Sequence, residues 1–424
     1  MNIVIFEDGN YGNFLPLSLT RPVWDLRTGC FSLRERWERL AESRGIAARF
    51  MYETREELAP LCAEAAPKLT VNDHAARAKA GGALFVNAAL IADARVFDIG
   101  ENSALVSGET VLAARLDAAA AAGLTGPARA ALASLPGLKK LRDDSFAVYG
   151  YLWDLVDGCG DAMRRDYGLI ARERSAAAPE GVTILGDGAQ VYIGKGARID
   201  PFVCIDATGG PVVILEGTTV HSFTRIEGPC FIGRDCVILG AKLRGGTSIG
   251  NGCRIGGEVE ASVFQGRSNK YHDGFIGHSY VGEWVNLGAL TTNSDLKNNY
   301  SAVRVSPGGK RVSTGRLKIG CYIGDHTRTG IGTLINTGSV IGPGCMLVQD
   351  GTMAPRHMPP FAWFIGGQLT EGESFESFIA TCETVMSRRG MATGAGLKGL
   401  LARLYESTKD ARRTESEEWK DRRK

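Results

Sequence analysis

The sequence predicts an α/β domain followed by a parallel β-helix and a helical tail, and three patterns support this prediction. Between about residues 183 and 349, an aliphatic residue recurs at every sixth position. Before this stretch, short apolar runs alternate with helical segments, and after it the leucines of the tail fall on one helical face. We therefore expect an α/β domain over residues 1–178, a β-helix over 179–365 and a helical, charged tail over 366–424.

The six-residue period fits neither an α-helix nor an alternating β-strand. It is typical of hexapeptide repeats, in which each repeat forms one short strand and one turn and three repeats close a triangular coil. A single repeat cannot bury its apolar face, whereas stacked coils bury a continuous core. The phase holds through two long runs: Ile214, Val220, Ile226, Ile232 and Ile238, and then Ile323, Thr329, Ile335, Ile341 and Leu347.

Composition bears on nucleic-acid binding, on the state of the cysteines and on the location of the protein. The formal net charge of +2 provides no bulk attraction to nucleic acid. Of the ten cysteines, Cys230, Cys236, Cys253 and Cys345 fall on the small interior position of the repeat, so we expect buried thiols rather than disulfides or zinc ligands. We find neither a signal peptide nor an apolar run of about 18 residues, which predicts a cytoplasmic protein.

Within the first 178 residues, local signals define several elements. Residues 2–6, 48–52 and 83–86 are predicted strands in a mostly parallel sheet, and residues 103–112 are a predicted hairpin. Residues 32–43 are a predicted helix, because Ser32 can cap it and Glu35 stands at the third position after the cap. The alanine-rich stretch 112–135 is predicted to be helical, with breaks at its glycines.

Two polar segments interrupt the hexads, at residues 263–274 and 291–318. Loops that project from a rigid scaffold often carry function. We therefore expect the functional residues of the β-helix to lie in these two insertions. After Met353 the pattern ends, and helices are predicted at about 373–389 and 397–406.

The segments AKLRGG (241–246), KYHDGFIGHSYVGEWVNLGA (270–289) and TTN (291–293) carry a family resemblance. They resemble the acetyltransferase domain of the bacterial bifunctional enzymes that make UDP-N-acetylglucosamine, the GlmU family of glucosamine-1-phosphate N-acetyltransferases and UDP-N-acetylglucosamine diphosphorylases. Residues 6–29 resemble a divergent branch with a reduced sugar-nucleotidyltransferase-like domain. The resemblance implies a left-handed β-helix, a homotrimer, acetyl-CoA as co-substrate and a role in sugar-nucleotide biosynthesis.

The resemblance also implies roles for individual residues. His272 matches the general base that accepts a proton from the attacking sugar amine, chemistry that suits an imidazole. His278 is the rival histidine and is interpreted as a turn residue. Arg244 matches the arginine that binds the sugar phosphate, Asn286 and Asn293 match the asparagines that hold the sugar, and the backbone of Ala289 matches a contact to acetyl-CoA.

Other cations have less specific assignments. Arg316, Lys318 and Arg328, together with Arg311, either bind the phosphates of coenzyme A or form a solvated basic face. The family lysine that follows Glu260 is absent here, and Lys270 or Arg267 is a candidate substitute.

The N-terminal domain departs further from the family pattern. The loop 8–13 is polar but not dense in glycine, Arg21 resembles the arginine that binds nucleotide phosphate, and Asn87 stands where a carboxylate would hold Mg²⁺ best. Asp25 and Asp93 are alternative carboxylates. Mg²⁺ is expected only if this domain is active.

Three functions stay open from sequence. The first is acetyl transfer to an amino-sugar 1-phosphate, with or without uridylyl transfer that forms UDP-N-acetylglucosamine. The second is nucleotidyl transfer to a sugar 1-phosphate, with the β-helix as a trimerisation scaffold. The third is a non-catalytic protein that binds a sugar nucleotide and assembles. In each case the partners are small molecules and further copies of the chain rather than nucleic acid or membrane.

Overall fold

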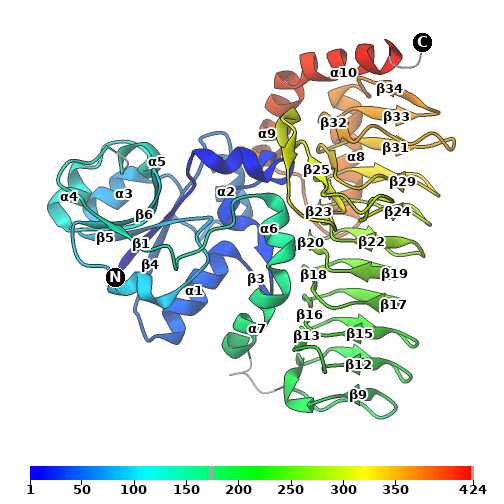
Figure 1. Ribbon diagram of the computed structural model, residues 1–424, viewed down its shortest axis with the longest axis horizontal. Coiled ribbons are helices and arrows are strands. Elements are labelled where there is room, and N and C mark those ends of the chain that lie inside the picture. The colour runs from blue at the N-terminus through cyan, green and yellow to red at the C-terminus, as the bar shows by residue number, and fades with distance from the viewer. Residues whose placement is uncertain (133, 171–174, 422–424) are drawn as a thin grey trace.

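The computed structural model describes residues 1–132, 134–170 and 175–421, so the last three residues of the predicted tail lie outside the described chain. The α/β domain lies beside a stack of β-helix coils, and the last helix crosses the end of that stack (Figure 1). The predicted fold class is confirmed. None of the helices in the described part of the chain has the length and apolar character that a membrane crossing requires.

A six-stranded sheet forms the centre of the N-terminal domain. Its order is β4 (Arg49–Glu53), β1 (Asn2–Phe6), β5 (Ala83–Asn87), β7 (Thr110–Leu116), β6 (Ser103–Ser107) and β8 (Lys139–Arg142). Strand β1 is parallel to β4 and β5, and β6 is parallel to β8, whereas β7 is antiparallel to both of its neighbours, so the sheet is mostly parallel as predicted, with one antiparallel strand inside it.

The helix predicted from residue 112 is wrong over its first five residues. This segment is the second half of β7, where Leu112, Ala114 and Leu116 are buried between two strands. Strand pairing here overrides the helical propensity of alanine. Among the described residues of this stretch, only α4 (Ala118–Gly123) and α5 (Ala128–Ala131) are helical.

The predicted capped helix is confirmed as α1 (Leu33–Ser43). Ser32 accepts a hydrogen bond from the Glu35 amide, and the Glu35 carboxylate accepts one from the Ser32 amide. The remaining helices of this domain are α2 (Ala59–Ala65), α3 (His74–Lys79), α6 (Leu152–Asp157) and α7 (Cys159–Ile170). Helices α6 and α7 lie between the sheet and the coils (Figure 1).

The β-helix has three parallel faces, which we number in chain order. The first face comprises β10 (Val191–Ile193), β13 (Val212–Ile214), β16 (Cys230–Ile232), β18 (Thr247–Ile249), β20 (Val263–Gly266), β23 (Tyr280–Glu283), β27 (Cys321–Ile323), β30 (Ser339–Ile341) and β32 (His357–Met358). The second comprises β11 (Arg198–Ile199), β14 (Thr219–Val220), the first parts of β17 (Val237–Leu243) and β19 (Arg254–Glu260), β21 (Asn269–Lys270), β28 (Arg328–Thr329), β31 (Met346–Val348) and β33 (Trp363–Ile365).

The third face comprises β9 (Thr183–Leu185), β12 (Cys204–Asp206), β15 (Arg225–Glu227), the second parts of β17 and β19, β22 (Phe275–Gly277), β24 (Thr292–Asn293) and β29 (Leu334–Ile335). The short strand β34 (Gln368–Thr370) pairs antiparallel with β33. Aliphatic residues of the hexads fill the prism, and the four cysteines at the small interior position are buried free thiols, as predicted.

Of the two predicted insertions, only the second leaves the coil. Residues 263–266 and 269–270 are strands β20 and β21 of an ordinary coil, because Phe264 points into the prism in the place of a smaller aliphatic residue. The second insertion forms an arm with β25 (Arg304–Val305) and β26 (Val312–Ser313) as an antiparallel hairpin.

The N-terminal domain covers the first face of the β-helix. Outward side chains of this face, including Tyr192, Phe231, Tyr280 and Tyr322, belong to the same buried cluster as the core of the N-terminal domain. The Tyr280 hydroxyl also accepts a hydrogen bond from the Arg27 amide at 2.8 Å. The first face is therefore an internal layer of the molecule.

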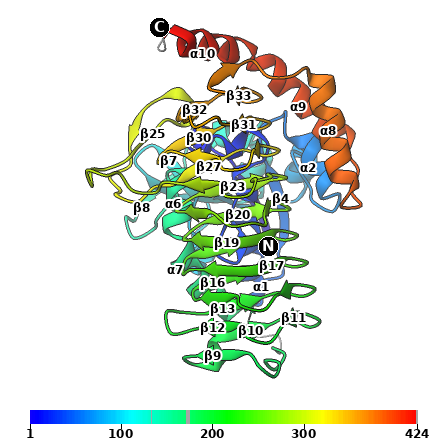
Figure 2. The ribbon, with the colours of Figure 1, turned by 90° about the vertical axis from the view of Figure 1, so that its right-hand side faces the viewer.

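The C-terminal helices contact both the β-helix and the N-terminal domain. Helices α8 (Phe375–Ser387) and α9 (Ala395–Ser407) lie beside the stack, and α10 (Lys409–Asp421), a separate helix within the predicted helical tail, crosses its end (Figure 2). The Arg389 guanidinium donates to the Gly252 carbonyl, α9 packs on α2, and Trp419 packs edge-on against Phe364 at the end of the prism.

His326 connects α8 to the coil and predicts an acid-sensitive stability. Its ring lies parallel to Trp284 and edge-on to Phe378, and burial lowers its pKa from 6.5 to about 4. The unfolded chain therefore binds a proton between these values when the folded chain does not, and stability falls as the pH drops from 6.5 toward 4. Between pH 7 and 4.5 we expect a loss of about 2–3 kcal/mol from this residue.

Urea unfolding of the wild type and of His326→Asn at both pH values checks this expectation. Asparagine tolerates the left-handed backbone at this position, where φ is 60°. The variant is expected to lose about 2–3 kcal/mol less than the wild type on acidification. Equal losses in both proteins would show that His326 does not titrate in this range.

Candidate active site on the third face

His272 lies at the edge between the second and third faces, in the turn from β21 to β22. Its side chain is exposed, with the Tyr271 ring edge-on beside it. Among the described residues, none forms a hydrogen bond with the His272 ring. The imidazole is therefore accessible to a substrate that approaches this edge.

Lys270 holds the turn that carries His272. Its side chain is buried, and its ammonium donates to the Gly256 carbonyl at 2.9 Å and to the His272 carbonyl at 3.0 Å. Burial lowers the pKa of Lys270 to about 8. This position does not favour the expectation that Lys270 binds phosphate, since its ammonium is directed at backbone carbonyls of the coil. The alternative, Arg267, pairs with Glu283 at 2.9 Å, away from this turn.

An open groove of about 350 Å³ lies on the third face beside the His272 turn. Lys242, Glu258, Asp273, Phe275 and Thr292 line it. Lys242 is exposed, and its ammonium pairs with no carboxylate of the described chain. The sequence analysis missed this lysine, although it stands two residues before Arg244 and thus on the same outward side of β17.

Arg244 borders this groove. Its guanidinium lies 3.2 Å from the Glu260 carboxylate, 3.5 Å from Glu258 and 3.9 Å from Glu227. Because Arg244 is half exposed, these ion pairs are weak and a phosphate can exchange with the carboxylates. Glu258 contacts both Arg244 and the groove, so the two features are continuous.

Two further predicted residues lie one coil above the His272 turn. The Leu290 amide donates to the Asp273 carbonyl at 2.8 Å, which stacks the turn containing Ala289 on the turn containing His272. Asn286 is exposed on the second face and accepts a hydrogen bond from the Asn269 amide at 3.2 Å. The fold thus brings His272, Asn286 and Ala289 to one edge.

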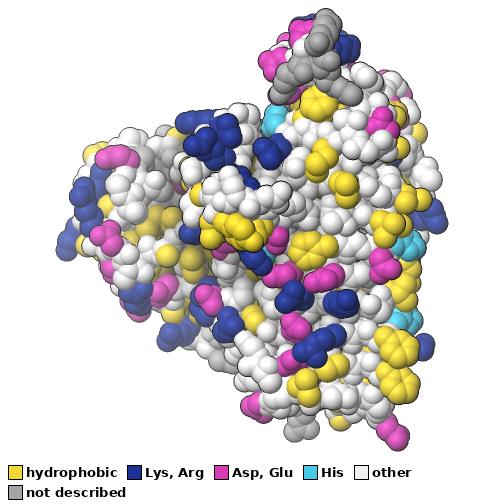
Figure 3. Space-filling model, turned by 45° about the vertical axis from the view of Figure 1, so that its right-hand side comes forward, with side chains coloured by type: hydrophobic (Ala, Val, Ile, Leu, Met, Phe, Trp, Pro, Cys, Tyr) yellow, Lys and Arg dark blue, Asp and Glu magenta, His cyan; other side chains and the backbone are white. Residues whose placement is uncertain are grey.

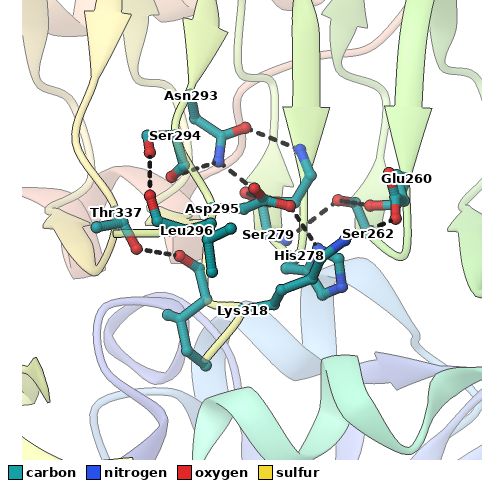
Figure 4. A network of polar contacts seen from close by, with 12 residues as sticks. Glu260, Ser262, His278, Ser279, Asn293, Ser294, Asp295, Leu296, Lys318 and Thr337 are labelled. Atoms are coloured by element: carbon teal, nitrogen blue, oxygen red, sulfur yellow. Dashed lines mark hydrogen bonds and ion pairs between the residues drawn. The ribbon is translucent and has the colours of Figure 1, made fainter. Parts of the chain in front are cut away.

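Asn293, in contrast to Asn286, is not exposed at the edge that carries His272. It is buried, its carbonyl accepts from the Gly277 amide at 2.8 Å, and its amide donates to the carbonyls of Gly277 and Ser294 (Figure 4). Both ends of the side chain bond the Gly277 backbone of the neighbouring coil, and the amide also bonds the carbonyl of the adjacent Ser294. This arrangement does not favour the prediction that Asn293 contacts the sugar, since the side chain joins two coils.

His278 occupies the opposite edge of the third face, in a left-handed turn with φ of 48°. Its Nδ1 lies 2.8 Å from the Asp295 carboxylate (Figure 4). Burial opposes ionisation of Asp295, but the hydrogen bond and charge of His278 and the charge of Lys318 lower its pKa below the ordinary value. The His278–Asp295 pair is a second arrangement with acid–base character, half-buried and next to the N-terminal domain.

The predicted basic group does not form. Arg316 pairs with Asp157 of α6 at 2.7 Å, and Lys318 pairs with Glu260 at 3.2 Å. Arg328 lies on the second face, and Arg311 lines a separate cavity at the arm. These four side chains lie apart because the arm of residues 294–318 folds onto the N-terminal domain.

Arg21 is buried at the junction of the two domains. Its guanidinium lies 2.6 Å from Asp325, 3.5 Å from Glu283 and 3.6 Å from Asp25, and the Thr20 hydroxyl donates to Asp325 at 2.7 Å. This arrangement does not favour the prediction that Arg21 binds a nucleotide phosphate, since its guanidinium is already paired with carboxylates of the β-helix. Removing one partner of such a buried pair leaves an uncompensated charge.

The carboxyl ends of β1 and β5 do not hold the Mg²⁺ ligands that the sequence suggested. The Asn87 amide donates to Asp8 at 2.9 Å and to the Val111 carbonyl, and its carbonyl accepts from the Ala89 amide. Asp93 pairs with Arg95, and Asp25 pairs with Arg21. A cavity of about 150 Å³ at these strand ends contains Asp8, Asn10, Glu109 and Arg129. Mg²⁺ is usually held by one or two carboxylates together with substrate phosphates and water, so Asp8 and Glu109 are the residues of this cavity that would hold it.

Comparisons with known proteins agree with both halves of the fold. The sugar nucleotidyl transferase family matches residues 3–175. A bifunctional sugar-1-phosphate nucleotidylyltransferase/acetyltransferase from Sulfurisphaera tokodaii is 38% identical over 158 residues, which cover 33% of this chain and 37% of that protein. The bifunctional protein GlmU from Carboxydothermus hydrogenoformans is 29% identical over 245 residues, which cover 49% of this chain and 47% of that protein.

A shorter relative is matched more completely. The uncharacterized acetyltransferase YaiX from Escherichia coli O6:K15:H31 is 34% identical over 178 residues, which cover 41% of this chain and 77% of that protein. The chain spans less than half the length of the two bifunctional relatives. The chain belongs to the family of the YaiX acetyltransferases, and it is a divergent GlmU-like protein that joins a domain matching the sugar nucleotidyl transferase family to a β-helix similar to those of acetyltransferases.

Proposed function

We propose that the chain transfers an acetyl group from acetyl-CoA to the amine of an amino-sugar 1-phosphate resembling glucosamine 1-phosphate, as a step of sugar-nucleotide biosynthesis in the cytoplasm. The observation that carries this proposal is the accessible His272 imidazole beside a groove that contains Lys242 and borders Arg244. The relatives named as acetyltransferases support the reaction class.

In this proposal the sugar amine attacks the thioester carbonyl while His272 accepts its proton. The carbon–sulfur bond then breaks, and the proton passes to the departing thiolate, so that the products are the N-acetyl sugar phosphate and coenzyme A. Lys242 and Arg244 bind the sugar phosphate, and Asp273 and Glu258 face the polar sugar. Asn286 and the Ala289 backbone, one coil above, bind the sugar and the acetyl donor.

A second candidate function is nucleotidyl transfer by the N-terminal domain, which would make the chain bifunctional and form UDP-N-acetylglucosamine with Mg²⁺. The match of residues 3–175 to the sugar nucleotidyl transferase family favours it. Against it, Arg21 is buried in an ion-pair cluster and Asn87 is tied to Asp8. In this candidate, Asp8 and Glu109 of the strand-end cavity are the carboxylates that remain for the metal.

A thiol-release assay with acetyl-CoA and glucosamine 1-phosphate tests the acetyl transfer. We expect His272→Ala to lower kcat/KM at least about a hundredfold, because general-base catalysis contributes about 10²–10⁴-fold. His221→Ala is the matched control, since His221 lies on the same edge but pairs with Asp200. It is expected to retain wild-type turnover.

The other outcomes separate the alternatives. If His272→Ala releases thiol at the wild-type rate while His278→Asn does not, the general base is the His278–Asp295 pair. This result would contradict the proposed site. Pyrophosphate release from UTP and N-acetylglucosamine 1-phosphate would add the second function. If neither thiol nor pyrophosphate is released, the results would favour a protein that binds sugar nucleotides without turnover.

We also propose that the chain assembles as a homotrimer through the edge that carries His272. Figure 3 shows hydrophobic and histidine side chains along this edge of the β-helix. Phe202 and Phe223 stack there with 71% and 78% of their surface exposed, and Ile331 is 78% exposed. Both phenylalanines adopt left-handed backbone, with φ of 66° and 65°, an unfavourable conformation for a bulky residue.

Sedimentation of the wild type and of Phe202→Ser/Phe223→Ser at micromolar concentration checks the assembly. The wild type is expected to sediment as a trimer and the double variant as a smaller species, because the apolar contact is lost. A monomeric wild type would contradict the proposed assembly without affecting the assignment of His272.

A further inference from the structure

Three arginines gather around one cavity at the arm, away from the groove at His272. The cavity measures about 290 Å³ and is lined by Arg304, Arg311 and Arg356, with Ser306, His357 and Glu415 completing the wall. This volume is close to the lower end of the range typical of small-molecule pockets. The sequence analysis had grouped Arg311 with other cations that the structure places elsewhere.

The hairpin of the arm directs two of these arginines to the same side. Val303 and Val305 are buried in the core of the N-terminal domain, so Arg304 between them points away from that domain. Arg304 pairs with Ser313 across the hairpin, and Arg311 stands two residues before Ser313 on the same side. Both guanidinium groups therefore face the cavity.

The arm is held tightly against the coil at this point. A Cβ atom on Gly338, where φ is 72°, would lie 2.7 Å from the Arg304 carbonyl oxygen and 3.0 Å from a Val303 methyl group. Only glycine permits this approach. Arg356 reaches the cavity from the start of β32, whose pairing with β30 includes a hydrogen bond from the Val340 amide to the Arg356 carbonyl.

Among the described residues that line this cavity, positive charge exceeds negative charge. In the described part of the protein, no carboxylate forms an ion pair with Arg304, Arg311 or Arg356. Glu415 of α10 is the one acidic residue in the lining, and it lies 3.5 Å from the His357 ring. Three neighbouring guanidinium groups repel each other unless an anion lies between them.

We propose that this cavity binds the diphosphate of a nucleotide ligand. Guanidinium groups bind phosphate oxygens through forked hydrogen bonds, and three of them match the charge of two linked phosphates better than that of one carboxylate. The ligand chemistry is shared by coenzyme A and by a nucleoside triphosphate, and the site does not depend on the assignment of His272. The rest of either ligand would extend from the open side of the cavity.

Titration calorimetry with inorganic pyrophosphate at low ionic strength tests the site without any turnover. The wild type is expected to bind pyrophosphate with an affinity that falls as salt is added. Arg304→Gln, Arg311→Gln and Arg356→Gln are each expected to weaken binding about tenfold. Lys310→Gln is the matched control, because Lys310 is an exposed cation of the same hairpin that does not line the cavity, and its affinity should be unchanged.

Competition identifies the source of the diphosphate. Displacement of pyrophosphate by coenzyme A assigns the cavity to the acyl donor, and displacement by UTP assigns it to the nucleotide substrate. Displacement by neither would overturn the proposal, as would equal affinities in the wild type and the single variants or an equal loss in Lys310→Gln. Thermal melts of each variant verify folding, which these exposed side chains do not support through any ion pair in the described chain.

Discussion

The burial of one face of the β-helix under the N-terminal domain is the constraint on which the other features depend. Arg21 and Asp325 lie in the middle of this contact, with aromatic side chains of the first face around them. The contact uses a surface that a free β-helix would expose to solvent. Because α8 covers part of the neighbouring edge, the third face and the edge that carries His272 are left for substrates and for other copies of the chain.

This constraint explains which basic residues form ion pairs within the chain and which do not. A cation that faces the interface is neutralised: Arg21 by Asp325, and Arg316 by Asp157. Some cations form no ion pair with a carboxylate of the described chain, such as Lys242 in the groove and the three arginines at the arm. These cations lie on surfaces that the interface leaves open. A basic residue is therefore a candidate ligand in this protein only after its position relative to the N-terminal domain is known.

The sequence was sufficient for the architecture because the architecture is periodic. The position of a residue within its hexad predicts whether its side chain enters the prism. The capping box of α1 is a local signal within four residues. His272, Asn286 and Ala289 were singled out by the family resemblance, and the fold brings them to one edge. By contrast, the intramolecular partners of Lys270, Asn293 and Arg21 lie 14, 16 and 304 residues away in sequence, which a single sequence does not reveal.

Calorimetric unfolding of the whole chain tests most directly whether the two domains form one unit. A shared hydrophobic interface with a buried ion pair predicts a single transition whose calorimetric enthalpy equals the van't Hoff enthalpy. Two separate transitions, with the N-terminal domain melting while the β-helix stays folded, would contradict the account. The first face would then be an exposed surface at the higher temperature, and its aromatic residues would need another explanation.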